Sequence, residues 1–284
     1  MTPVPRRRSP VSYWIARALH LTRVFDWVYA AAYRARSELV AAWASEDVLD
    51  RFNDIAYAST PSYHPDAASF RAYLFPFEEE AIRDFFPKPP AHVLIGGAGG
   101  GREALALAAL GYRITAFEPS PKLAAALAAR AHNGPSLAVY RASYENLPLL
   151  EKTPGPGTVP LDALPRIDGV IAGWGSFSHL RSRELRVAAL ERLAGATDGP
   201  ILVSFIGLFD DRKPPASALG RLRRALPRRH GRDPGDAFSI SIGFFHRTNA
   251  REVDDLAAAA GLEIVYRSFD MRWNSPHVVL RRQS

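Results

Sequence analysis

The stretch from Ala91 to Pro121 constrains the fold more than any other part of the chain. It opens with an apolar run, His92–Ile95, typical of a strand buried on both faces of a parallel sheet. After a glycine-rich turn, the Ala- and Leu-rich segment Arg102–Leu110 predicts a helix. A second apolar strand, Arg113–Phe117, then ends at an acid. This succession predicts the first half of a nucleotide-binding α/β sheet.

The turn between the first strand and the helix is made of small residues. Its residues are Gly96, Gly97, Ala98, Gly99, Gly100 and Gly101. Glycine adopts positive φ and lets a ligand approach the backbone closely, and the helix that follows presents unpaired N–H groups. Glu118, at the end of the second strand, is placed to accept hydrogen bonds from a ribose diol.

The glycine spacing indicates which nucleotide is bound. The dinucleotide pattern G-x-G-x-x-G fails, because its third glycine after Gly97 and Gly99 would fall on Arg102. The alternating glycines instead resemble motif I of the class I S-adenosylmethionine-dependent methyltransferases, with Glu118 as the acid of the second strand.

The resemblance covers roughly residues 85–284. Segment 167–176 is similar to the fourth strand and its loop, segment 200–205 to the fifth strand, and segment 248–280 to the closing helix and hairpin. There is one departure. The family usually carries Asp or Glu two positions before the first of the alternating glycines, where this chain has Ile95. Binding of the methionine end is therefore expected to use backbone groups or other side chains.

The family resemblance implies both a fold and an activity. The implied fold is α/β, a seven-stranded, mostly parallel Rossmann-like sheet with helices on both faces. Residues 1–86 would form an N-terminal helical lid region, and residues 87–284 the S-adenosylmethionine-binding domain, with a basic insertion at 210–236. The implied reaction transfers a methyl group from S-adenosylmethionine to a small-molecule or peptide acceptor, at O or N rather than C, and releases S-adenosylhomocysteine.

The resemblance also assigns cofactor contacts. They fall on the glycine turn, the following strand ends and the fourth-strand loop, namely Gly96, Gly97, Ala98, Gly99, Gly101, Glu118, Pro119, Ser143, Tyr144, Gly173 and Trp174. The segment before motif I is commonly a lid in this family. Because aromatic faces and carboxylates attract a sulfonium, Tyr57, Tyr63, Tyr73, Phe75 and Glu78 are candidate walls, of which Tyr73 and Glu78 are assigned to the cofactor. The alternative is that these aromatic residues are core.

Candidates for catalysis and acceptor binding lie at the same sheet edge. His179 is the first candidate for a general base, because imidazole titrates near neutral pH; alternatively it caps the helix 182–194. Tyr63, His64 and His246 are further catalytic candidates. Acceptor contacts are predicted at Arg102, Trp174, Arg247 and Trp273. The basic segment 210–236 would attract a phosphate or carboxylate group of the acceptor, unless it is a solvated insertion. RNA binding is less favoured there, since aromatic residues are absent from the run.

Composition excludes several classes of protein. The chain has 284 residues, a formal net charge of +7 and no cysteine, which excludes disulfides, thiol catalysis and cysteine-ligated zinc; no metal site is predicted. The apolar N-terminal run is interrupted by the charged residues Arg17, Arg23 and Asp26, so neither a signal peptide nor a membrane span is expected. We therefore expect a cytoplasmic location. The predicted helical region Val11–Trp43 would cover the domain or join two subunits in a homodimer, rather than lie on a membrane surface.

Three other functions stay open from the sequence. The first is a nicotinamide- or flavin-dependent oxidoreductase, which the failed dinucleotide spacing disfavours. The second is an RNA methyltransferase, for which no appended RNA-recognition module is visible. The third is a non-enzymatic binding protein with a degenerate site, supported by Ile95 alone.

Overall fold

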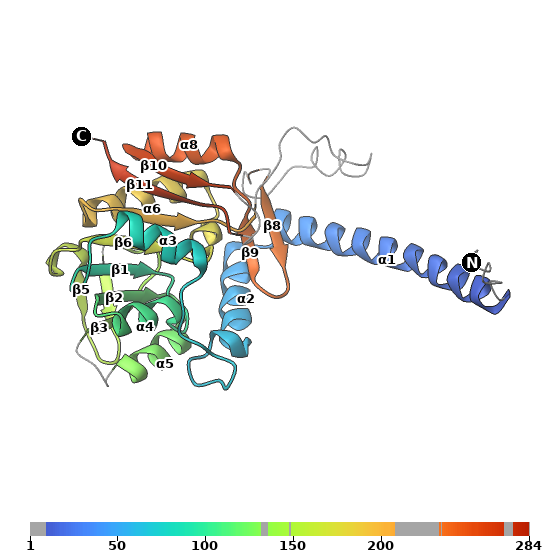
Figure 1. Ribbon diagram of the computed structural model, residues 1–284, viewed down its shortest axis with the longest axis horizontal. Helices are drawn as coiled ribbons and strands as arrows, with labels where there is room; N and C mark the ends of the chain where they lie inside the picture. Colours follow the sequence, from blue (N-terminus) through green and yellow to red (C-terminus); the bar gives the residue numbers. More distant parts are fainter. Residues whose placement is uncertain are drawn as a thin grey trace, which may run out of the picture.

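The computed structural model describes residues 10–131, 136–147, 149–207, 233, 235–269 and 275–283. A central sheet has the strand order β10-β11-β7-β6-β1-β2-β3-β4-β5, with helices on both of its faces (Figure 1). The class predicted from the glycine turn, a mostly parallel α/β sheet, is therefore confirmed.

Five parallel strands form the centre of the sheet. They are β1 (His92–Gly96), β2 (Arg113–Glu118), β3 (Leu137–Arg141), β6 (Gly169–Ala172) and β7 (Ile201–Ser204). Every residue of β1, β6 and β7 is buried, because helices cover both faces of the sheet. This is why these strands read as unbroken apolar runs rather than as alternating patterns.

A hairpin closes one edge of the sheet. Strand β11 (His277–Arg282) runs antiparallel between β7 and β10 (Leu262–Ser268). Both strands were expected from the sequence. The closing hairpin over 262–282 therefore follows a parallel centre, as expected from the sequence of residues 248–280.

The other edge differs from the expectation. In the described residues the sheet has nine strands rather than seven, because β4 (Leu149–Lys152) and β5 (Thr158–Pro160) extend it beyond β3. Strand β5 lies within a segment rich in proline and glycine, residues 153–165. The strand is three residues long, ends in proline and lies largely in solvent, so it carries no hydrophobic period that a sequence could display.

Two apolar cores lie on the two faces of the sheet. One core lies under α3 (Pro76–Phe85), α4 (Arg102–Ala109) and α5 (Pro121–Ala131); the other lies under α6 (Arg183–Ala196) and α8 (Ala250–Ala259). Neighbouring residues of β1 point to opposite faces, so Leu94 belongs to the second core while Val93 and Ile95 belong to the first.

The N-terminal segments meet a small separate hairpin. Within the described residues, strands β8 (Asp236–Ser239) and β9 (Gly243–His246) pair only with each other. The chain reverses between them, and Gly243, the first residue of β9, has a φ of +72°. The hairpin contacts α1 (Pro10–Trp43) through a hydrogen bond from the Ser37 hydroxyl to the carbonyl of Phe238.

The second helix, α2 (Glu46–Ser59), holds the same hairpin from another side. The Asn53 side-chain oxygen accepts a 3.0 Å hydrogen bond from the Phe244 backbone N–H. Leu49, Phe238 and Phe244 form a third apolar cluster, in which the side chain of Phe52 packs on Phe238. The hairpin is thus fixed between the N-terminal helices and the body of the domain.

The first half of α1 extends away from the domain (Figure 1). Large apolar side chains on it are exposed, among them Leu21 at 59%, Phe25 at 75% and Val28 at 52%. Within the described part of the chain, no helix combines the length and apolar character that crossing a membrane requires.

Candidate functional site

A cavity of about 600 Å³ opens at the carboxyl ends of β1, β2 and β6. Ligands of such sheets bind at this edge, where neighbouring strands connect to opposite faces. Residues of α2 and of the short helix η1 (Pro61–Tyr63) form its other side. The N-terminal segment therefore contributes walls to the cavity; its predicted movement as a lid stays a prediction.

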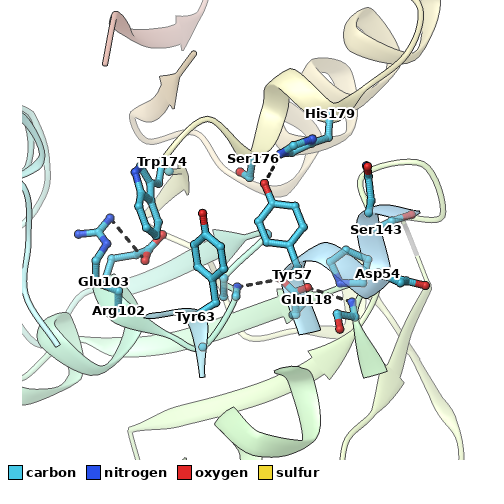
Figure 2. A pocket seen from close by; sticks show the side chains of 18 of the residues that line it. Asp54, Tyr57, Tyr63, Arg102, Glu103, Glu118, Ser143, Trp174, Ser176 and His179 are labelled. Atoms are coloured by element: carbon cyan, nitrogen blue, oxygen red, sulfur yellow. Dashed lines mark hydrogen bonds and ion pairs between the residues drawn. The ribbon is translucent and has the colours of Figure 1, made fainter. Parts of the chain in front are cut away.

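Glu118 is the buried acid in the cavity wall, as predicted. Its carboxylate accepts hydrogen bonds from the backbone N–H groups of Gly99, at 2.8 Å, and Ser120, at 2.9 Å (Figure 2). Burial raises the pKa of Glu118 to about 7, although these two amides oppose the rise. Each carboxylate oxygen keeps acceptor capacity, so the group can still receive hydroxyl donors from the cavity.

The space around the backbone differs from one position of the glycine turn to the next. Gly99 has a φ of +56°, and a Cβ there would meet no atom within 4 Å, because the residue faces the open cavity. At Gly100 a Cβ would lie 1.9 Å from the carbonyl oxygen of Tyr63, so the η1 segment sits directly on this glycine. Gly97 and Ala98 also line the cavity, whereas Gly96 and Gly101 do not.

Those two glycines pack against neighbouring side chains, and their predicted contact with the cofactor stays a prediction. A side chain at Gly101 would meet Leu127 of α5, and one at Gly96 would meet Phe117 and Tyr144. Their physical role is to let the turn pack against its neighbours.

Aromatic side chains cover one side of the cavity. The rings of Tyr63 and Trp174 lie 5.1 Å apart, and the ring of Phe75 lies 5.6 Å from that of Trp174. Tyr73 also lines the cavity. Trp174 has a φ of 44°, which is uncommon for a residue with a side chain and is found mainly where the surrounding structure enforces it. This backbone holds the indole at the cavity, where it was predicted.

His179 lies at the cavity, but Tyr57 stands between its imidazole and the open space (Figure 2). The Tyr57 hydroxyl is 2.6 Å from Nε2, and Nδ1 is 2.6 Å from the carbonyl oxygen of Phe244. Because a carbonyl can only accept, Nδ1 carries the proton and Nε2 accepts one from Tyr57. Burial lowers the pKa of His179, which favours this neutral form.

Arg102, predicted to contact the acceptor, lines the cavity, and its guanidinium is bound to a buried carboxylate. Its guanidinium donates two hydrogen bonds, of 2.6 and 2.7 Å, to the Glu78 carboxylate and lies 4.1 Å from the centre of the Phe75 ring. The cation therefore ties α3 to α4 and supports the aromatic wall from behind. Glu78 is fully buried by this pair and does not line the cavity; its predicted contact with the cofactor stays a prediction.

The remaining predicted residues divide into two groups. Pro119, Ser143, Tyr144 and Gly173 line the cavity, as expected, whereas His64, His246 and Arg247 do not. His64 lies behind the η1 segment, half-buried, and Arg247 is exposed beyond the hairpin. Trp273 and the basic residues from 210 to 232 lie outside the described residues. The prediction that the basic insertion attracts an acidic acceptor stays a prediction.

His246, a predicted catalytic candidate, belongs instead to a buried network of charges. Its two ring nitrogens lie 2.7 Å from the Asp236 carboxylate and 2.9 Å from the Glu252 carboxylate. Both nitrogens therefore donate, which requires the charged imidazolium. Arg186, fully buried on α6, pairs with Glu252 and with Asp233. This network joins the hairpin to α6 and α8 and is structural.

The sequence did not point to Asp54, Glu103 and Ser176, all of which line the cavity. Glu103 is in the first turn of α4, where an acid is common for reasons of helix stability alone. Ser176 donates its hydroxyl proton to the Gly96 carbonyl oxygen and accepts a 2.8 Å hydrogen bond from the Tyr144 hydroxyl. No sequence signal marks such contacts between distant loops.

No family model matches the sequence, and no curated protein does. Solved structures do resemble the fold. The CcbJ methyltransferase from Streptomyces caelestis is 16% identical, with a TM-score of 0.48 over 68% of this chain and 84% of that chain. A 1,6-didemethyltoxoflavin-N1-methyltransferase from Burkholderia thailandensis, solved with S-adenosylhomocysteine, is 16% identical, with a TM-score of 0.46 over 100% and 94%.

A third structure, described as a putative Zn-dependent alcohol dehydrogenase from Rhodobacter sphaeroides, is 13% identical, with a TM-score of 0.51 over 82% of this chain and 99% of that chain. At such identities the likeness concerns the fold alone. The activities in these names belong to those proteins.

The His246 network predicts a pH-dependent contribution to stability. Burial opposes the charge on His246, but its carboxylate partners outweigh burial and raise its pKa above the ordinary 6.5. The contribution is therefore complete below pH 6.5 and is lost as the pH rises through the higher pKa of the folded state. His246→Gln should lower Tm by several degrees at about pH 6 and by less at about pH 8.

Thermal unfolding followed by circular dichroism measures this difference. His20→Gln, at an exposed histidine of α1, is the matched control and should change Tm equally little at both pH values. An equal loss of Tm at both pH values for His246→Gln would show that the imidazolium charge contributes nothing.

Proposed function

We propose that this protein transfers a methyl group from S-adenosylmethionine to a small-molecule acceptor, at oxygen or nitrogen. The observation that carries the proposal is the buried carboxylate of Glu118 at the end of β2, beside a glycine turn that faces open space. A ribose diol supplies the hydroxyl donors that such a carboxylate accepts, and the small residues leave room for the adenosyl group.

Residues around Glu118 fit the rest of the cofactor. The loop after β3, with Ser143 and Tyr144, would border the adenine, and the aromatic side chains of Tyr63 and Trp174 would face the sulfonium, which aromatic rings attract. S-adenosylmethionine supplies an already activated methyl group. The protein therefore has to orient the two reactants and exclude water.

The shape of the cavity supports a small acceptor. Its walls come from both sides, from the sheet edge and from α2 and η1, and aromatic rings form much of its apolar surface. A planar acceptor can stack on such rings.

The pair Tyr57–His179 would act on an acceptor that carries a proton. The acceptor hydroxyl or N–H would give its proton to the Tyr57 oxygen while the Tyr57 hydroxyl gives its own to Nε2 of His179, 2.6 Å away. The acceptor atom then forms its bond to the methyl carbon as the carbon–sulfur bond breaks and its electron pair stays on sulfur. The Phe244 carbonyl would stabilise the resulting imidazolium through Nδ1–H.

The projecting half of α1 supports a homodimer. Trp14, Leu21, Phe25 and Val28 recur at spacings of seven, four and three, the repeat by which two helices pair. A helix on a membrane surface would keep one face charged, but Leu19 and Trp27, on other faces of α1, are also 63% and 67% exposed. A second copy of the chain, bringing its own α1, would cover this surface.

Binding of adenosyl compounds tests the cofactor directly. We expect S-adenosylmethionine and S-adenosylhomocysteine to raise Tm, and NAD and NADP to leave it unchanged. Glu118→Gln should weaken S-adenosylhomocysteine binding by about tenfold to a hundredfold in calorimetry, because a charged acceptor is lost. Stabilisation by NAD instead would favour the oxidoreductase, and no stabilisation by any of the four would refute the cofactor.

Kinetics test the proton path. With an acceptor found by screening phenols and heteroaromatic amines against radiolabelled S-adenosylmethionine, Tyr57→Phe should lower kcat by about a hundredfold or more and change KM for S-adenosylmethionine little. Tyr112→Phe, at a buried tyrosine outside the cavity, is the matched control. Equal kcat values for the two variants would remove Tyr57 from the mechanism.

Light scattering after size exclusion tests the dimer. The wild type should have the mass of two chains, and the double variant Leu21→Glu, Phe25→Glu should have the mass of one, because charges would be buried between the helices. Leu110 is as exposed as Leu21, at 59%, but lies on the domain. Leu110→Glu should therefore stay dimeric, and a monomeric wild type would refute the pairing.

A further inference from the structure

The cavity contains a second buried carboxylate that the cofactor contacts described so far do not use. Glu103 is 3% exposed and projects from the first turn of α4 toward Gly173 and Trp174 (Figure 2). Glu118 lies between it and the other end of the cavity, where Asp54 and Ser143 are found. The two carboxylates therefore mark different positions along the same space.

The charges around Glu103 do not balance. Among the described residues, Arg102 is the one cation within ion-pair distance of its carboxylate, at 3.6 Å. Arg102 is already engaged by Glu78, at 2.6 Å. One guanidinium thus faces two buried carboxylates, and with both carboxylates ionised the group carries one negative charge in excess. A buried charge is costly unless it is paired, and burial accordingly raises the pKa of Glu103.

A ligand cation at this end of the cavity would supply the missing charge. Gly173 follows β6, the strand beside β1, and a Cβ there would lie 2.8 Å from Oε1 of Glu103. The absence of a side chain at Gly173 thus leaves the carboxylate room beside this strand end. The site is close to the aromatic wall, on the side of Glu118 away from Ser143.

S-adenosylmethionine has a cation beyond its sulfonium, the ammonium of its methionine end. Ile95, where the related proteins usually carry an acid, cannot bind it, since its side chain is fully buried in the core under α4. Glu103 is the carboxylate on the methionine side of the cavity. We infer that Glu103 binds the α-ammonium of the cofactor and replaces the acid missing at position 95. This inference rests on the proposed function.

Two adenosyl ligands distinguish binding of the α-ammonium from binding of the rest of the cofactor. S-adenosylhomocysteine carries the amino-acid end, whereas 5′-methylthioadenosine keeps the adenosine and the thioether without it. In calorimetry, Glu103→Gln should weaken the binding of S-adenosylhomocysteine by about tenfold to a hundredfold, the range for a charged hydrogen bond. The affinity for 5′-methylthioadenosine should stay within about twofold of the wild-type value. Glu118→Gln, the matched control, should weaken both ligands alike.

A third ligand makes the test independent of any substitution. The analogue of S-adenosylhomocysteine that lacks the amino group should bind the wild type more weakly than its parent, by the same factor as the Glu103→Gln loss. The variant should bind the two compounds equally. An equal loss of both adenosyl ligands in Glu103→Gln, or no loss, would overturn the assignment. Failure of every adenosyl compound to bind the wild type would instead refute the proposed function.

Discussion

The carboxylate of Glu118, held between two backbone amides, is the contact on which the site depends. One amide belongs to Gly99 in the turn after β1 and the other to Ser120 in the turn after β2. The same acid therefore fixes the ends of two neighbouring strands and presents its free lone pairs to the cavity. Its burial is tolerated because both oxygens are hydrogen-bonded. Substitution at this position changes the loop geometry and the ligand contact together.

The residues that form the walls of the cavity hold one another in place. Glu78 caps the start of α3 and binds Arg102, and Arg102 lies beneath the rings of Phe75 and Trp174. Gly100 has no side chain because the carbonyl of Tyr63 occupies that space. The N-terminal segment is therefore attached to the sheet edge through backbone contact and a buried ion pair, and the aromatic side of the cavity depends on both.

The sequence predicts the sheet and the glycine turn well, because both leave strong local patterns. Buried strands read as apolar runs, and Gly97, Gly99 and Glu118 are spaced as one known nucleotide site requires. It predicts side-chain roles less well. Arg102 and His246 have the chemistry of site residues, but buried partners from distant segments, Glu78 and Asp236, engage them. The sequence did not predict the edge strands β4 and β5, because they have no hydrophobic period of their own and form by pairing, β4 with β3 and β5 with β4.

The β8–β9 hairpin lies between the N-terminal helices and the body of the domain. Ser37 of α1 bonds to Phe238 on one of its strands, and on the other the carbonyl of Phe244 fixes the tautomer of His179. In α2, Asn53 bonds to the same strand and Tyr57 bonds to His179 itself, so both N-terminal helices are connected to this imidazole. In the proposed homodimer, a partner bound to α1 would therefore act on the hairpin and, through it, on the proposed proton acceptor.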